Sequence, residues 1–308
     1  MRLHTELETY RKDPARPLFL AVGNFDGLHA GHRKIIARVL EDARAAGGTA
    51  AVLTFRQHPQ QVLNPDAAPK LLTSLDQKVF LLQEMGLDAC FLLSFTEAFS
   101  KQSAEDFVSK VLKERLGVRK VYLGYSAHFG YARKGTPALM KELAVRHEFL
   151  FEEIGPVQAA GEAVSSSTIR KWVESGMFDQ ARMGLGRQFS IFSTVVRGDG
   201  RGAQLGFPTA NFDIAGLTVP ANGVYPVSLR RVTKKQEGLE KGVEQWKFQI
   251  DEPLKGAANL GFRPTFGPKG QRALEAFIFN FKEEVYGQTF EVSLKLRVKA
   301  HKEKDPPA

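Results

Sequence analysis

The sequence of 308 residues contains one cysteine, two tryptophans and no apolar run near the roughly 20 residues of a membrane-spanning helix. A single cysteine excludes an intramolecular disulfide framework, and the position of Cys90 in the apolar run ACFLL favours a buried thiol over a nucleophile. The N-terminal segment MRLHTELETYRKD lacks the apolar core of a signal peptide. We therefore expect a cytoplasmic protein with no membrane association.

A concentrated block of positive charge is also missing, although the net charge is +9. Residues 1–185 carry 24 Lys and Arg against 21 Asp and Glu, and residues 186–308 carry 19 against 13. The excess is spread along the chain, as in solvated faces and tails. Aromatic residues are not interleaved with basic ones as they are in a platform that stacks bases. We expect no nucleic-acid partner, and a mildly basic surface suits small anionic substrates.

The length and the pattern of apolar runs predict two domains, because a single core rarely grows beyond about 250 to 300 residues. In the first half, short apolar runs alternate with helical patterns, which predicts a parallel sheet covered by helices on both faces. The strands are expected at 18–22, 49–55, 89–95, 120–124 and 148–154, and the helices up to about 46 and near 74–85, 103–116 and 136–147. Ligands of such sheets bind beyond the carboxyl ends of the strands.

From about residue 187 the helical pattern gives way to β-rich segments separated by Gly, Pro and Asn. These segments, at 189–197, 223–231, 244–250, 273–281 and 289–298, predict an antiparallel barrel or sandwich. A short helical stretch at 178–187 marks the boundary, so the expected domains are 1–185 and 186–308. The polar segment 233–242 is predicted to be a hairpin loop.

The segment GNFDGLHAGH, Gly23 to His32, follows an expected strand and opens an expected helix. Its glycines permit positive φ and close backbone approach, so a polyphosphate can lie near the amides at the helix N-terminus. The i, i+3 spacing places His29 and His32 on one face, where both can donate hydrogen bonds to phosphate oxygens as charge builds up. Two histidines that only cap a helix or face solvent are the alternative, and a zinc site is disfavoured because a second Cys/His pair is absent.

The same segment is similar to the adenylylation motif of the prokaryotic bifunctional riboflavin kinase/FAD synthetases, a family of HxGH nucleotidyltransferases. The resemblance implies an α/β Rossmann-like nucleotidyltransferase domain followed by a six-stranded antiparallel β-barrel kinase domain. It implies phosphorylation of riboflavin to FMN and then adenylylation of FMN to FAD with release of pyrophosphate, both with ATP and Mg²⁺. It gives catalytic roles to His29 and His32, and ATP or phosphate contacts to Gly23, Asn24, Phe25, Asp26 and Gly31.

Two further segments of the first half resemble the family. TFRQHP, residues 54–59, is similar to its TFxPHP segment, which implies that His58 and Pro59 lie by the flavin; a strand that ends in an exposed turn is the alternative. SSSTIR, residues 165–170, is similar to its SSTxIR loop. This likeness implies ATP phosphate contacts from Ser165, Ser166, Ser167 and Arg170, whereas the residues alone also fit a serine-capped helix start.

One segment departs from the family pattern. GYSAHFG stands where GxDFRFG or GxNFxFG is usual, so Ser126, Ala127 and His128 replace an acidic or amide residue, an aromatic and often an arginine. Ser126 and His128 are still expected on the flavin side. His128 either replaces the missing donor or is an ordinary loop residue.

The second half contains GDGRGAQLGFPTANF, residues 198–212. Backbone amides of a glycine-rich turn can cradle phosphate, here through Gly198, Gly202 and Gly206, and oxygens of Thr209 and Asn211 suit a magnesium ion that also holds ATP. Hairpin residues without a ligand are the alternative. Together with RPTFG and an acidic strand the segment resembles the kinase module, which implies that Glu275 is the general base and that Asn259 and Arg263 lie near the flavin substrate.

The acidic strand carries its own signal, because alternation puts Glu275, Phe277 and Phe279 on one face, and an acid beside aromatics is typical of a pocket. Ala203, Phe277 and Asn280 stand where the family has arginine, histidine and aspartate. The family usually continues into a terminal helix that covers the flavin, and we expect that in this chain the helix is either absent or replaced by a shorter closure. The bifunctional transferase is therefore our main hypothesis. A single-activity member is the alternative, a non-catalytic flavin or RNA binder is a third hypothesis, and a transient homo-oligomer stays open.

Overall fold

The computed structural model describes residues 1–197, 209–262, 272–281, 283–295 and 299–300. Its elements form two compact units that are interleaved in the sequence. The first unit contains Met1–Pro69, Lys78–Ser165 and Lys235–Lys247; the second contains Lys70–Gln77, Ser166–Lys234 and Phe248–Ala308. The helix α3 (Leu75–Glu84) and the strands β11 (Gly223–Glu240) and β12 (Val243–Ile250) each have residues in both units. The expected boundary at residue 185 stays a prediction.

The first unit is built on a sheet whose strands run in the order β12-β1-β4-β3-β2-β5-β6, with parallel pairing from β1 to β6. The strands are β1 (Arg2–His4), β2 (Leu18–Val22), β3 (Thr49–Phe55), β4 (Ala89–Leu93), β5 (Val118–Gly124) and β6 (Leu150–Ile154). The central strands are continuous apolar runs because both of their faces are buried. The predicted parallel α/β sheet is confirmed, and β1 is a strand that the sequence pattern did not indicate.

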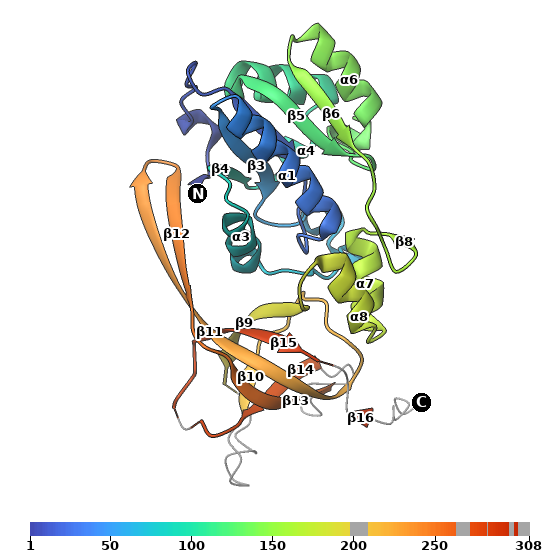
Figure 1. Ribbon diagram of the computed structural model, residues 1–308, viewed down its shortest axis with the longest axis vertical. Helices are drawn as coiled ribbons and strands as arrows, with labels where there is room; N and C mark the ends of the chain where they lie inside the picture. Colours follow the sequence, from blue (N-terminus) through green and yellow to red (C-terminus); the bar gives the residue numbers. More distant parts are fainter. Residues whose placement is uncertain (198–208, 263–271, 282, 296–298, 301–308) are drawn as a thin grey trace. The chain divides into compact units, whose positions relative to one another are not determined.

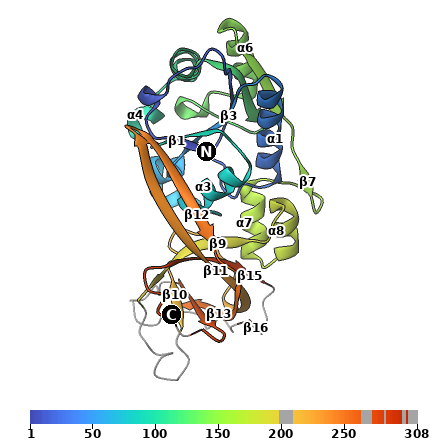
Figure 2. The same cartoon turned by 60° about the vertical axis from the view of Figure 1, so that its left-hand side comes forward.

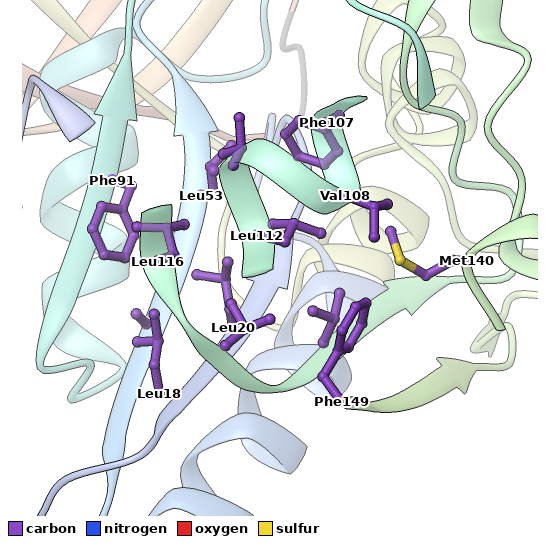
Figure 3. Packing of buried hydrophobic residues seen from close by; sticks show 14 of the residues in the cluster. Leu18, Leu20, Leu53, Phe91, Phe107, Val108, Leu112, Leu116, Met140 and Phe149 are labelled. Atoms are coloured by element: carbon purple, nitrogen blue, oxygen red, sulfur yellow. The ribbon is translucent and has the colours of Figure 1, made fainter. Parts of the chain in front are cut away.

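Helices cover both faces of this sheet (Figure 1). The long helices are α1 (Ala30–Ala45), η3 (Phe107–Leu116) and α6 (Pro137–Arg146), and the short ones are η1 (Leu7–Thr9), α2 (Pro59–Leu63), η2 (Pro65–Ala67), α4 (Glu97–Ser100), α5 (Ala104–Asp106) and η4 (Tyr131–Arg133). Side chains of η3 and α6 interlock with alternate residues of the strands, such as Leu18, Leu20 and Leu53 (Figure 3). The buried residues of α1 lie outside this cluster, so α1 covers the other face.

The expected hairpin loop at 233–242 is wrong, because the segment forms a two-stranded ribbon. Strand β11 continues to Glu240, a turn follows in which Gly242 has a φ of 69°, and β12 begins at Val243 (Figure 2). Within the first unit, Val243 and Glu244 pair with His4 and Leu3 of β1. The polar sequence suggested a loop because a ribbon leaves most of its side chains exposed, which removes the apolar alternation of a half-buried strand.

The second unit contains a closed six-stranded antiparallel barrel with the order β13-β14-β10-β9-β15-β11, in which β11 also pairs with β13. The remaining barrel strands are β9 (Ser190–Val196), β10 (Ala210–Phe212), β13 (Leu254–Phe262), β14 (Arg272–Ile278) and β15 (Thr289–Leu294), and β16 (Lys299–Ala300) pairs with the start of β11. Leu260, Leu274 and Phe290 are fully buried in the interior. The predicted barrel is confirmed, although β10 and β13 were not expected as strands.

Two helices, α7 (Ser166–Glu174) and α8 (Phe178–Leu185), also belong to the second unit. A small hairpin, β7 (Gln158–Ala159) and β8 (Glu162–Ala163), belongs to the first. No helix within the described residues is long and apolar enough to cross a membrane.

Candidate functional sites

The parallel sheet of the first unit changes its winding direction between β2 and β5. From β2 the chain proceeds to β3 and β4 on one side, and then crosses to β5 and β6 on the other. The loops after β2 and β5 therefore diverge at the carboxyl edge of the sheet, where doubly wound folds bind their ligands. These loops are residues 23–29 and 125–136, and they contain most of the site residues that the sequence predicts for this unit.

The β2–α1 loop has an unusual backbone. Gly27 has a φ of 82°, as its glycine permits, but Phe25 and Leu28 also have positive φ values of 50° and 42°. Both of these side chains are buried, which holds the loop in a conformation that costs non-glycine residues of order 1 kcal/mol or more each. Asp26 is also buried, and only Asn24 of the GNFD segment is exposed. The Thr54 hydroxyl donates to the carbonyl of Asn24 at 3.1 Å and ties the loop to β3.

The two histidines lie where the loop enters α1. His29 is the N-cap of the helix, and its Nδ1 accepts the backbone N–H of His32 at 3.4 Å. The imidazole rings stack with centroids 3.7 Å apart, and Phe25 meets the His32 ring edge-on. Gly31 gives the stacked imidazole room, because a Cβ there would lie 3.1 Å from the His29 ring. An Nδ1 used as an acceptor leaves Nε2 of His29 as its N–H donor.

Burial keeps His32 neutral. Desolvation lowers its pKa well below the usual value, and the charges of His29 and Lys78 act in the same direction. Its Nδ1 is buried without a hydrogen-bond partner among the residues that the structure describes. At neutral pH His32 can therefore offer a single N–H, from Nε2, to a phosphate oxygen.

Lys78 is a functional candidate that sequence reasoning missed. Its side chain is buried, and Nζ donates to the carbonyl of Phe55 at the end of β3 at 2.5 Å. Burial lowers the pKa of Lys78 to about 8, although the nearby Cys90 and Asp26 oppose the shift. In the sequence it is one of several charged residues on a helix, so only the fold reveals that it lies beneath the β2–α1 loop.

His58 and Pro59 begin α2 directly after β3. The Nδ1 of His58 accepts the backbone N–H of Gln60 at 3.2 Å, and the side chain of Gln61 completes a capping box. Pro59 occupies the first turn of the helix, where its missing N–H costs nothing. Both residues lie at the carboxyl edge of the sheet, so their capping role and the predicted place beside a ligand are compatible.

Some residues of the loop after β5 (residues 125–136) pack into the core, and others are exposed to solvent. Ala127 and Phe129 pack against the hydrophobic cluster, whereas Ser126 and His128 are exposed. The change from the family's aromatic to Ala127 thus affects packing. The Nδ1 of His128 lies 3.0 Å from the carbonyl of Ser126 and 3.3 Å from Nη2 of Arg133. Sequence reasoning did not single out Arg133, because four residues separate it from His128 and only the turn brings the two side chains together.

The SSSTIR segment spans the division between the units. Val164 carries the carbonyl nearest to the position of a Gly31 Cβ, at 3.8 Å, so the chain before Ser165 passes the start of α1. Ser166, Ser167 and Arg170 lie on α7 in the second unit. There Arg170 Nε donates to the carbonyl of Lys70 at 2.6 Å.

In the barrel, three predicted residues form one row across adjacent strands. Asn211 of β10 is paired directly with Glu275 of β14, which is paired with Asn259 of β13. Directly paired residues project from the same face of a sheet. This is the outer face of the barrel, because the neighbouring Leu274 and Ala276 fill the interior. Asn211 is buried, Glu275 is half-buried and Asn259 is exposed.

Aromatic side chains lie near Glu275, and the pocket that the sequence predicts there stays a prediction. Phe277 projects from the same face of β14, and its ring meets that of Phe279 with centroids 5.8 Å apart. Strand β14 ends at Ile278, earlier than predicted, because Asn280 turns the chain with a φ of 56°. Thr209 is half-buried and directly precedes β10. Gly198, Gly202, Gly206 and Arg263 lie outside the described residues.

The oxygen donors of Thr209 and Asn211 fit a hard cation such as Mg²⁺, which usually takes few protein ligands and completes its shell with phosphates and water. Within the described part of the chain, no group of three His, Cys, Asp or Glu is placed to hold a metal ion. A metal in the barrel would therefore depend on hydroxyl and amide oxygens together with its substrate.

Two families of known proteins match successive parts of the chain. The family described as FAD synthetase matches residues 11–168, and the family described as riboflavin kinase matches residues 185–305. A bifunctional riboflavin kinase/FMN adenylyltransferase from Buchnera aphidicola (subsp. Schizaphis graminum) is 31% identical over 91% of this chain and 85% of its own. Those from Pseudomonas fluorescens and Bacillus subtilis are 32% and 31% identical, over 88% and 92% of this chain and 81% and 84% of theirs.

A solved structure, described as a macrolide-efflux protein from Streptococcus pneumoniae, covers 98% of this chain and 92% of its own with a TM-score of 0.76. Its sequence identity is 23%, so the likeness concerns the fold alone.

An HxGH loop at the switch point of a parallel sheet, joined to a closed barrel with an acid on its outer face, defines a two-module transferase acting on nucleotides. The chain belongs to the bifunctional riboflavin kinase/FMN adenylyltransferase family. It combines a riboflavin kinase with an FMN adenylyltransferase in one polypeptide.

Proposed function

We propose that the β2–α1 loop is the site of adenylyl transfer, and the stacked pair of His29 and His32 carries this proposal. A phosphate oxygen of FMN forms a bond to the α-phosphorus of ATP, the bond from that phosphorus to the bridging oxygen breaks, and pyrophosphate leaves with the electron pair. Nε2–H groups of the two imidazoles donate to the phosphate oxygens on which charge accumulates. No covalent enzyme intermediate is needed.

The remaining residues of this site position the substrates. Backbone amides at the start of α1 bind ATP phosphates. The phosphates can reach these amides because Gly31 has no side chain and because the preceding loop leaves room for them; that loop is Gly23, Asn24, Phe25 and Asp26. Contacts to ATP phosphates also stay the proposed role of the hydroxyls of Ser165, Ser166 and Ser167 and of the guanidinium of Arg170. His58, Pro59, Ser126 and His128 lie on the flavin side.

For the barrel, we propose that Glu275 is the general base of the riboflavin kinase. The row that Glu275 forms with Asn211 and Asn259 supports this role, because one carboxylate stands between two amides on the outer face. Glu275 accepts the proton of the ribityl hydroxyl while that oxygen forms its bond to the γ-phosphorus of ATP and ADP leaves. Asn259 and Arg263 orient the flavin.

Thr209 and Asn211 would hold Mg²⁺ beside the phosphates that the loop of Gly198, Gly202 and Gly206 cradles. When bound, the ion neutralises charge on the transferred phosphoryl group and on ADP. The side chains themselves fix where the γ-phosphorus lies relative to Glu275. The cytoplasmic location, the absence of a nucleic-acid partner and the oligomeric state stay predictions.

Two substitutions separate the sites. Glu275→Gln keeps the size of the side chain and removes the base, so we expect FMN formation from riboflavin to fall about 100-fold or more while conversion of FMN to FAD is unchanged. His29→Ala should have the reverse effect, with a loss of about 100-fold in FAD formation. Both rates are measured on purified protein by chromatography of the flavins, with ATP and Mg²⁺ in excess.

Glu252→Gln and His147→Ala are matched controls, because Glu252 is an exposed residue between β12 and β13 and His147 follows the last turn of α6. Both should leave the two rates unchanged. Equal effects of Glu275→Gln and His29→Ala on both steps would contradict the assignment to two sites. An unsubstituted protein that performs only one step would support the single-activity alternative.

A further inference from the structure

The β5 loop returns on itself through a turn with strained backbone. Phe129 and Gly135 exchange backbone hydrogen bonds of 3.1 and 2.9 Å, and the residues between them include Ala132 and Arg133, with φ values of 53° and 59°. Two consecutive non-glycine residues in the left-handed region cost of order 1 kcal/mol or more each, so the surroundings must hold them there.

Packing against α5 holds this turn. Gly130 has a φ of 69°, and a Cβ there would lie 2.6 Å from the backbone nitrogen of Ala104. The Tyr131 N–H donates to the carbonyl of Gln102 at 2.7 Å. The position of Arg133 is therefore set by backbone contacts on the preceding part of the turn, and its guanidinium is brought to 3.3 Å from His128.

The guanidinium remains available to a ligand. Nδ1 of His128 can accept at most one N–H from Arg133, and a guanidinium has five N–H donors. Among the described residues, Arg133 has no carboxylate partner, and its side chain is exposed. A guanidinium with free donors thus lies beside His128, the position at which the family often has an arginine.

The loop that contains Arg133 leaves the sheet at the switch point, which indicates which group it meets. Strands β2 and β5 are adjacent and parallel, with Ala21 paired to Tyr122, and Gly124 lies against Ile35 of α1. The β5 loop therefore borders the β2–α1 loop, to which we assign the phosphates of ATP. The attacking phosphate of FMN must approach the α-phosphorus from the side away from the leaving pyrophosphate, and it is itself an anion that needs a cation.

We propose that Arg133, held beside His128 by the strained turn, binds the phosphate of FMN during adenylylation. The proposal rests on the adenylylation site proposed above. A guanidinium can grip two phosphate oxygens at once, which fixes the attacking oxygen as well as neutralising its charge. Arg133 thereby supplies a permanent positive charge beside His128.

The test is a steady-state analysis of FAD formation with FMN and ATP varied separately. Arg133→Ala should raise the KM for FMN about tenfold or more, as expected for loss of a charged hydrogen bond, with the KM for ATP within about twofold. The KM of Arg133→Lys for FMN should lie between those of the unsubstituted protein and of Arg133→Ala. An ammonium keeps the charge but cannot bind two phosphate oxygens with the paired N–H groups of a guanidinium. Lys134→Ala, which removes one exposed charge from the adjacent position, should change neither constant.

Folding is checked in the same preparations by the rate of riboflavin phosphorylation, which uses the other site. If Arg133→Ala loses that rate as well, the comparison rests on Arg133→Lys. An unchanged KM for FMN, an equal rise in the KM for ATP, or the same effect from Lys134→Ala would overturn the proposal. An unsubstituted protein that forms no FAD would instead overturn the adenylylation site itself.

Discussion

Burial of the Lys78 side chain near the proposed adenylylation site lowers the stability of the folded protein. Its ammonium is buried beneath the β2–α1 loop, where its hydrogen bond to Phe55 fixes the end of β3. Desolvation disfavours the charged form, which explains the pKa of about 8. A shift of this size corresponds to about 3 kcal/mol of destabilisation when both the folded and the unfolded protein are charged.

The sign of this effect gives a testable pH dependence for Lys78. Above its unfolded pKa, near 10.5, the amine is neutral in both states and costs nothing; as the pH falls toward 8 the unfolded state binds the proton first and is favoured. Lys78→Met should therefore be more stable than the unsubstituted protein at pH 7, with a difference of up to about 3 kcal/mol that shrinks between pH 8 and 10. Urea unfolding at several pH values measures it, and a difference that does not vary with pH would contradict the assignment.

Cys90 should be inert in the folded protein. Its side chain is fully buried in β4, and burial raises the pKa of the thiol to about 12. Since the thiolate is the reactive form, we expect no labelling by a thiol reagent at pH 8 in buffer and one labelled thiol per chain in denaturant. Rapid labelling of the native protein would show that the sheet opens locally.

At the scale of elements, the geometry at the start of α1 depends on the absence of a Cβ at Gly31. Gly31→Ala would place Cβ 3.1 Å from the His29 ring and push this imidazole by a few tenths of an ångström from its place against His32. We expect FAD formation to fall on the order of tenfold, because small misplacement of catalytic groups is costly. Riboflavin phosphorylation should not change. Gly47→Ala is unsuitable as a control because of its positive φ, whereas Gly155→Ala meets open space and should leave both rates unchanged.

Strand β1 makes the first unit sensitive to acid. His4 stacks on Phe91 and meets Tyr10 edge-on, and burial, aided by the charge of Arg2, lowers its pKa. Above about pH 6.5 the ring is neutral in both states; below it, the unfolded state gains a proton that the folded state resists, so stability is lost as the pH falls. His4→Phe should retain more of its stability than the unsubstituted protein between pH 6.5 and 5, as measured by thermal unfolding. Parallel acid sensitivity of the two proteins would exclude His4 as the cause.

The elements that the sequence predicted well are those whose pattern reflects local burial. The buried strands at 18–22 and 49–55 match β2 and β3, and the spacing of His29 and His32 brings their rings together. Strand β1, the ribbon and Arg133 depend on contacts distant in sequence, so periodicity could not reveal them. The row of Asn211, Glu275 and Asn259 likewise required the register of three strands, which sequence spacing does not contain.

At the scale of the whole molecule, the interleaving of the two units limits how the chain can be divided. A fragment of residues 1–185 lacks Lys235–Lys247, which the first unit uses to cover β1. An uncovered strand edge invites pairing between molecules. We expect this fragment to unfold on the order of 5 °C lower than the same fragment joined by a flexible linker to residues 233–249, and to self-associate more readily. Equal melting and equal monodispersity would show that the ribbon contributes nothing to the first unit.

The pairing of β1 with β12 also has a consequence for synthesis on the ribosome. Translation proceeds at about 5–20 residues per second, so the partner of Leu3 and His4 is made on the order of 10–50 s after them. During that interval β1 can align with β4 on one edge while its other edge waits for a segment that has yet to be translated. A holdase chaperone would therefore act on the nascent first unit in this interval, by covering the free edge of β1.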